Sequence, residues 1–109
     1  MQLPKMAKAK QIFDQPEITD IPGKIREELY NKNLNARVKS GQRIAVTAGS
    51  RGISNIPLII KTIVEELKAA GAEPFVLPAM GSHGGATSEG QAPIRRDNGI
   101  DPDVGADLV

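Results

Sequence analysis

The sequence has 109 residues, no cysteine, one histidine, and a net charge of +1 from 14 basic and 13 acidic side chains. This length allows one small domain, and the composition excludes disulfides, cysteine-ligated zinc and a strongly basic surface for nucleic acid. The longest apolar stretch, residues 56–60, is far shorter than the roughly 20 residues that cross a bilayer, and the N-terminus lacks the apolar core of a signal peptide. We therefore expect a cytoplasmic protein with neither a nucleic acid nor a membrane as partner.

Residues 1–10 contain three lysines without a periodic apolar pattern. They predict a flexible basic arm that becomes ordered only against another surface. Residues 11–13, Gln-Ile-Phe, are typical of a short edge strand, which the proline at the end of residues 14–16 would stop. We assign residues 11–109 to part of one α/β domain.

A first helix is predicted over residues 21–33. Asp20 is a suitable N-cap, and Pro22 suits the first turn. Apolar side chains recur every four residues, which indicates an amphipathic helix of about three turns. These side chains are Ile21, Ile25 and Leu29.

A strand–helix–strand unit follows. Residues 43–47 and residues 73–78 are short apolar segments that indicate strands. A helix between them begins after a capping Ser54 or Asn55 and ends at Gly71, the residue type that favours a left-handed terminus. Its broad apolar face consists of Ile56, Ile59, Ile60, Ile63, Val64 and Leu67.

The last part of the chain carries weaker signals. Ser88 and Gln91 have the spacing of a capping box and predict a third helix that Gly99 stops. Residues 106–109 resemble the start of a further strand.

A strand–helix–strand unit of this length predicts two parallel strands with a right-handed crossover. Two parallel strands make too narrow a sheet, because parallel sheets have several strands and are covered on both faces. Either the terminal segments supply edge strands, or the sequence is a piece of a longer chain. We favour the second interpretation, an incomplete three-layer Rossmann-like N-terminal domain built on parallel βαβ units, with the remainder and a second domain elsewhere.

Two similar loops follow the two strands. Residues 49–52 read Gly-Ser-Arg-Gly, and residues 81–84 read Gly-Ser-His-Gly. Parallel strands end at the same edge of the sheet, where ligands of α/β proteins bind and where helix N-termini favour an anion. Arg51 could hold a carboxylate with its planar fork, and His83 could transfer a proton near neutral pH.

We therefore predict His83 as the catalytic residue and a set of neighbours as substrate- or cofactor-binding residues. That set is Arg51, Ser50, Gly49, Ser82, Gly81 and Gly84. None of them is predicted to ligate a metal. The alternative is that both loops are ordinary turns, since glycine-rich loops are common in α/β proteins and a lone histidine is more often a surface residue. Neither loop matches a dinucleotide fingerprint, a P-loop or a nucleophile elbow.

With residues 44–52 and residues 78–87, the chain resembles the N-terminal part of the nickel-dependent lactate racemase family. The resemblance extends from about residue 11 to the end and includes the intervening helix. It implies racemisation or epimerisation of a 2-hydroxy acid, with hydride removed from the α-carbon and returned by a nickel pincer nucleotide. His83 matches a proton-transferring histidine of that family, and Arg51 matches an arginine that contacts the substrate or cofactor.

The resemblance also implies that the nickel ligand, the lysine that tethers the cofactor and a second catalytic histidine lie beyond Val109. A chain with these residues alone is then expected to be inactive. The family carries Asp-x-Thr-Arg-Pro and Gly-Thr-His-Arg-Pro at the two loops, whereas residues 48–52 and residues 81–85 lack the acidic residue, the second arginine and both prolines. This difference argues against lactate itself as substrate. Two other functions stay open: a non-catalytic domain that binds a phosphate or carboxylate, and a structural oligomerisation domain.

Overall fold

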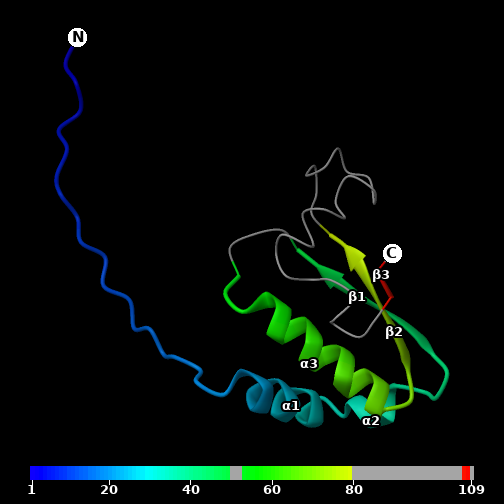
Figure 1. Cartoon of the computed structure of the whole chain (residues 1–109). Coiled ribbons are helices and arrows are strands. Elements are labelled where there is room, and N and C mark those ends of the chain that lie inside the picture. Colours follow the sequence, from blue (N-terminus) through cyan, green and yellow to red (C-terminus); the bar gives the residue numbers. More distant parts are fainter. Residues whose placement is uncertain (50–52, 80–106, 109) are drawn as a thin grey trace.

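The computed structural model describes residues 1–49, 53–79 and 107–108 (Figure 1). It contains helices and a parallel sheet, which confirms a mixed α/β chain. Its elements in chain order are α1 (Ile21–Asn31), α2 (Leu34–Arg37), β1 (Arg43–Ala48), α3 (Ile56–Ala69), β2 (Glu73–Pro78) and β3 (Asp107–Leu108). The helix predicted between Ser88 and Gly99 lies outside the described residues.

The start of α1 follows the predicted capping pattern. Asp20 is the N-cap, and its Oδ1 accepts a hydrogen bond from the Gly23 backbone N at 3.0 Å. The helix ends at Asn31, two residues before the predicted end, because Asn33 adopts a left-handed backbone with φ of 55°. The same residue is the N-cap of α2, a four-residue helix that the sequence did not predict.

The end of α3 confirms the role predicted for Gly71, whose φ is 89°. The Gly71 N donates to the Lys68 O at 2.9 Å, and the Ala72 N donates to the Leu67 O at 3.0 Å. This pair of bonds is a Schellman motif, which satisfies the last carbonyls of the helix and turns the chain into β2.

The sheet has the strand order β1-β2-β3, and all its pairs are parallel. Six residues of β1 pair with six of β2, from Arg43 opposite Glu73 to Ala48 opposite Pro78. β1 is one residue longer than predicted, and β2 has the predicted bounds. The two strands that precede the predicted site loops are therefore direct neighbours.

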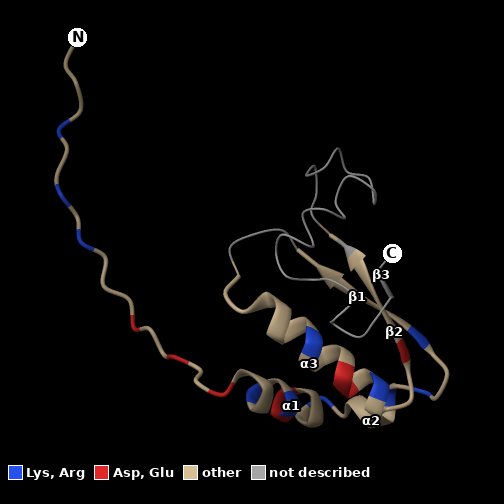
Figure 2. Ribbon diagram, in the orientation of Figure 1, with Lys and Arg blue, Asp and Glu red and all other residues tan. Residues whose placement is uncertain are grey.

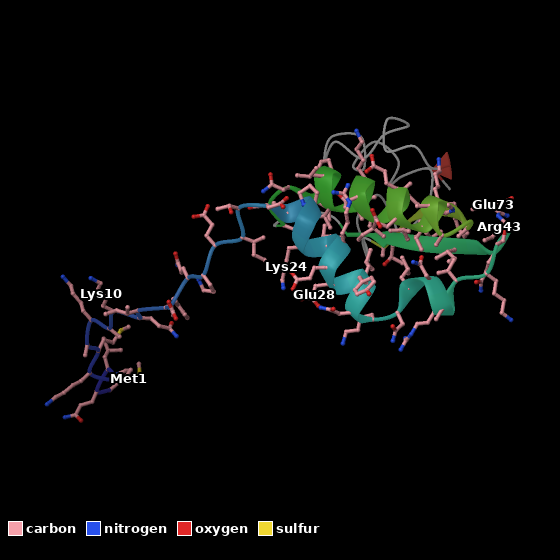
Figure 3. The ribbon with its side chains drawn as sticks, turned by 90° about the horizontal axis from the view of Figure 1, so that it is seen from below. Met1, Lys10, Lys24, Glu28, Arg43 and Glu73 are labelled. Carbon is pink, nitrogen blue, oxygen red and sulfur yellow. The ribbon has the colours of Figure 1, made fainter. Side chains whose placement is uncertain are left out.

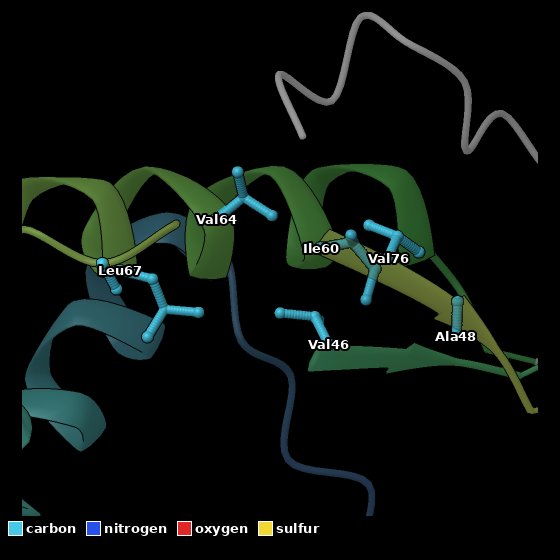
Figure 4. Packing of buried hydrophobic residues seen from close by; sticks show 7 residues of the cluster. Val46, Ala48, Ile60, Val64, Leu67 and Val76 are labelled. Atoms are coloured by element: carbon cyan, nitrogen blue, oxygen red, sulfur yellow. The ribbon is translucent and has the colours of Figure 1, made fainter. Parts of the chain in front are cut away.

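The core lies between α3 and one face of the sheet (Figure 4). Side chains alternate along a strand, and on β1 the residues Ile44, Val46 and Ala48 face the core while Ala45 and Thr47 are exposed. Three residues of the apolar face predicted for α3 are buried, namely Ile60, Val64 and Leu67, which confirms the prediction for these three. The buried hydrophobic cluster consists of Val46, Ala48, Ile60, Val64, Leu67, Ala72 and Val76.

A second contact joins α1 to the outer side of α3. The Arg26 Nε lies 2.9 Å from the Glu66 Oε1, and its guanidinium also lies 3.7 Å from the Glu65 carboxylate. Thr62, one turn before Glu66, is buried on this side although it is polar. Its hydroxyl donates to the Leu58 O at 2.8 Å, so burial leaves no unsatisfied donor there.

Residues 1–20 form neither helix nor strand and are exposed throughout. They extend away from the folded body (Figure 1), and the whole molecule measures 67 × 35 × 22 Å. The edge strand predicted at residues 11–13 is wrong for the single chain, because a strand requires a paired neighbour and the described part of the chain supplies none to this segment. Within the described part of the chain, no helix is long and apolar enough to cross a membrane.

Candidate functional site

The candidate site lies at the carboxyl ends of β1 and β2. The Ala79 N donates to the Ala48 O at 2.8 Å, so the ladder between the strands continues to their last residues. The first loop starts at Gly49 and the second at Ala79, on neighbouring strands about 4.8 Å apart. This arrangement confirms that the chain leaves both strands at one edge of the sheet.

Of the predicted site residues, the structure describes only Gly49. This residue follows β1, is half-buried, and has open space within 4 Å of the position that a Cβ would take. A ligand could therefore approach the backbone closely here. The other predicted site residues lie outside the described residues, and their roles stay predictions: Ser50, Arg51, Gly81, Ser82, His83 and Gly84.

The N-terminus of α3 adds a feature that the sequence prediction missed. Asn55 occupies the N-cap position, as one of the two predicted candidates, but its side chain makes no capping hydrogen bond. Its backbone is left-handed, with φ of 59° and ψ of 26°, a conformation that asparagine tolerates better than most residues. Because the N-cap side chain satisfies none of the first backbone N–H groups, this end of the helix keeps its capacity to bind an anion.

The charged residues of β1 and β2 lie at the opposite end of these two strands. Arg43 and Glu73 are paired in register at the amino ends of β1 and β2, and they lie at one end of the molecule in Figure 3. The Arg43 guanidinium lies 4.9 Å from the centre of the Phe75 ring, a distance typical of a cation–π contact. Arg43 is therefore an arginine of the same sheet that lies away from the candidate site.

An apolar groove of about 410 Å³ lies between the first turns of α1 and α3. Lys24 is the only cation among its lining residues, and its Nζ is 2.9 Å from the Glu28 carboxylate and 3.4 Å from that of Glu27. These acids hold the pKa of Lys24 above its ordinary value, chiefly through the hydrogen bond to Glu28. Because the charge of Lys24 is already paired, it adds little to anion binding in this groove.

Among the described residues, no group of three or more acidic, histidine or cysteine side chains could hold a metal ion. No model of a known protein family, no curated protein and no solved structure matches the chain.

Proposed function

We propose that this chain is part of an enzyme that racemises or epimerises a 2-hydroxy acid with the help of a nickel pincer nucleotide. The observation that carries the proposal is the hydrogen bond between the Ala79 N and the Ala48 O, which sets the starts of both loops side by side. We also propose a fold more specific than a mixed α/β chain, namely an incomplete three-layer Rossmann-like domain. In this fold, further chain covers the sheet face that bears Ala45 and Thr47.

The loop lengths allow the two predicted side chains to act on one small molecule. Arg51 follows Gly49 by two positions, and His83 follows Ala79 by four. At about 3.6 Å per residue, the Arg51 Cα lies within roughly 7 Å of the Gly49 Cα, and the His83 Cα lies within roughly 14 Å of the Ala79 Cα. A ligand above the edge of the sheet is then within reach of both side chains.

Each residue has a chemical role in this proposal. Arg51 binds the substrate carboxylate through two parallel N–H···O bonds and fixes its orientation. His83 accepts the proton of the 2-hydroxyl group as the α-carbon is oxidised, and it returns a proton when the hydroxyl is formed again. The uncapped start of α3 adds positive potential for the same anion.

The described residues fit the anionic part of such a ligand. Gly49 leaves open space above the sheet edge, and Asn55 leaves the helix end without a side-chain cap. When bound, the nickel pincer nucleotide supplies the group that accepts a hydride from the α-carbon and gives it back to either face. Donors for the metal belong to the part of the protein that follows Val109.

The proposal is tested by replacing His83 with glutamine in the full-length, cofactor-loaded protein. The interconversion of the substrate's stereoisomers is then followed by chiral chromatography. Loss of a general acid–base typically lowers the rate by about 10²–10⁴-fold, and we expect a decrease of this size with an unchanged nickel content. Interconversion at the wild-type rate would show that His83 does not carry the proton.

The uncapped start of α3 also favours a second candidate function, a non-catalytic domain that binds a phosphate or carboxylate. Stereoisomer interconversion and nickel content of the wild-type protein, measured as controls in the same experiment, distinguish the enzyme from the binding domain. An anion-binding domain would bind 2-hydroxy acids or phosphate without interconverting stereoisomers, and the wild-type protein would contain no nickel after expression with the cofactor-building enzymes.

A further inference from the structure

Among the residues that the structure describes, none pairs with the outer edge of β1, and the strand pairs only with β2. The Glu73 N bonds to the Gln42 O, and the Ala79 N bonds to the Ala48 O, so the even-numbered residues of this strand bond inward. In a parallel ladder the intervening residues direct their N–H and C=O groups to the other side. Arg43, Ala45 and Thr47 therefore present their backbone groups to the outer edge.

This edge lacks the features that normally protect an edge strand. Charged side chains, prolines and bulges prevent such edges from pairing with another chain. β1 has a charge only at its first residue, Arg43, and the five residues that follow, Ile-Ala-Val-Thr-Ala, contain no charge and no proline. Its register with β2 runs without interruption, so there is no bulge either. β1 is therefore a template for an added strand.

The N-terminal segment, residues 1–20, contains a stretch suited to this edge. Ile12 is 83% exposed and Phe13 is 62% exposed, although both are large apolar residues that favour strands. Asp14 follows them, and Lys10 precedes them. The segment is thus basic at its start and acidic closer to α1, as Figure 2 shows.

We propose that residues 10–14 of one copy of this chain add to the outer edge of β1 in a second copy as an antiparallel strand. Asp14 then lies opposite Arg43, with Ile12 opposite Ala45. Lys10 lies opposite Thr47. In an antiparallel ladder alternate pairs of residues exchange two backbone hydrogen bonds, and these three pairs use the outward groups of β1.

The charges select the antiparallel direction. With residues 10–14 antiparallel to β1, Asp14 meets Arg43, and opposite charges across a strand pair stabilise it. In a parallel arrangement Lys10 would lie at the Arg43 end, where like charges repel. The antiparallel register also puts Phe13 beside Ile44, on the face of the sheet that α3 covers.

The geometry favours a second copy of the chain, instead of the same copy, as the source of the strand added to β1. The segment leaves α1 in a direction away from its own sheet (Figure 1) and contacts no strand of that sheet. When two copies exchange their segments, each supplies one strand and one edge, so the interaction closes as a symmetric dimer and leaves no unpaired copy of β1.

Cysteine crosslinking tests the register, since the chain has no native cysteine. Residues opposite each other in a hydrogen-bonded antiparallel pair have Cα atoms about 5.5 Å apart, which suits a disulfide. Ile12→Cys protein mixed with Ala45→Cys protein should form a mixed disulfide dimer under mild oxidation. Ile18→Cys, from the same exposed segment but outside the register, should not couple to Ala45→Cys above background.

Two outcomes of this experiment would overturn the proposal. Equal coupling of Ile12→Cys and Ile18→Cys to Ala45→Cys would show that the segment collides with the edge without pairing. An intramolecular disulfide in a monomeric double variant of Ile12 and Ala45 would show that the segment pairs with its own sheet.

A proline substitution tests the backbone bonds without a new charge. Ile12→Pro removes one N–H donor from the added strand, at a residue that is 83% exposed and does not line the groove that residues 16–18 form with α1 and α3. Sedimentation of the full chain should show a dimer whose dissociation constant rises about tenfold or more with Ile12→Pro and stays within about twofold with Ile18→Pro. A wild-type chain that is monomeric at all concentrations, or a dimer that Ile12→Pro leaves unchanged, would contradict the proposal.

Discussion

The two ends of the β1–β2 pair differ in how their backbone groups are satisfied. At the amino end, the Gly41 N donates to the Gly71 O at 2.8 Å, and the Glu73 N donates to the Gln42 O at 2.9 Å. At the carboxyl end, the Ala79 N donates to the Ala48 O at 2.8 Å, the last described bond of the ladder, and the N-cap side chain of α3 makes no capping hydrogen bond. The chain itself satisfies the backbone groups at the amino end, and we propose the carboxyl end as the side at which a ligand binds.

From this difference we expect stability and ligand binding to depend on opposite ends of the β1–β2 pair. Substitutions at the amino end should alter the free energy of unfolding and leave ligand binding intact. Substitutions at the carboxyl end should do the reverse, because Gly49 has open space around it and α3 begins without a side-chain cap. The predictions that follow test this division.

The largest effect is expected on ligand binding, when substitutions of two arginines, Arg51 and Arg43, are compared. In the full-length protein, Arg51→Lys should weaken substrate or cofactor binding about 10–100-fold, because lysine lacks the planar fork that binds a carboxylate through two charge-assisted hydrogen bonds. Arg43→Lys, at the amino end of the same strand, should leave binding unchanged. Calorimetric titration measures both, and equal losses in the two variants would contradict the division.

Two glycines provide the next comparison. Gly71→Ala should destabilise the fold by about 1–2 kcal/mol, because a left-handed residue with a Cβ is strained and this Cβ would lie 3.3 Å from the Ser40 Cα. A Cβ at position 49 would meet open space, so Gly49→Ala should change stability by less than about 0.5 kcal/mol. The same substitution should lower the affinity for the substrate. Urea unfolding measures the first effect, and a larger loss for Gly49→Ala would reverse the assignment of the two ends.

The N-cap of α1 lies at neither end of the β1–β2 pair. Its substitutions therefore provide a stability change with which those at the two ends can be compared. Asp20→Ala removes the carboxylate that accepts a hydrogen bond from the Gly23 N and should cost about 1 kcal/mol. Asp20→Asn keeps an acceptor and should retain most of that stability. Both values come from urea unfolding, and equal losses in the two variants would show that the hydrogen bond contributes nothing.

The smallest effect is expected from the exposed pair of Lys24 and Glu28, which are labelled in Figure 3. Their hydrogen bond lowers the pKa of Glu28 below its ordinary value of 4.5 and raises that of Lys24 above 10.5. The contribution of Glu28 to stability is therefore present above pH 4.5 and is lost as the pH falls through its lowered pKa. That of Lys24 is present below pH 10.5 and is lost as the pH rises through its raised pKa.

Exposed ion pairs contribute little, so Glu28→Gln should change stability at pH 7 less than Gly71→Ala or Asp20→Ala. The difference between Glu28→Gln and the wild type should vanish below the lowered pKa of Glu28. A difference that grows as the solution becomes more acidic would show that another group is responsible.

The elements predicted correctly from the sequence have local signals. Asp20 and Pro22 start α1, and Gly71 ends α3, because capping depends on residues within one or two turns of the chain. The wrong prediction at residues 11–13 was of another kind. A strand exists only with a partner, and the sequence of three residues cannot specify whether one is present. The burial of Thr62 also depends on a distant element, since α1 covers that side of α3.

The candidate site was predictable only in outline. Parallel strands end at one edge whatever their sequence, so the shared edge of the two loops followed from the βαβ pattern, whereas the direct pairing of β1 with β2 did not. The missing side-chain cap at Asn55 did not, because asparagine is both a good N-cap and a residue that tolerates a left-handed backbone. Which of these roles it takes depends on the path of the preceding loop.

The division between the two ends of the strand pair is tested most directly by hydrogen–deuterium exchange of the full-length, cofactor-loaded protein with and without a 2-hydroxy acid. The substrate should slow exchange in peptides that contain Gly49 and the first turn of α3, and in peptides that follow Ala79. Exchange in peptides that contain Gly41 and Gly71 should not change. Protection confined to the amino end, or no protection at either end with a substrate that the enzyme interconverts, would contradict the account.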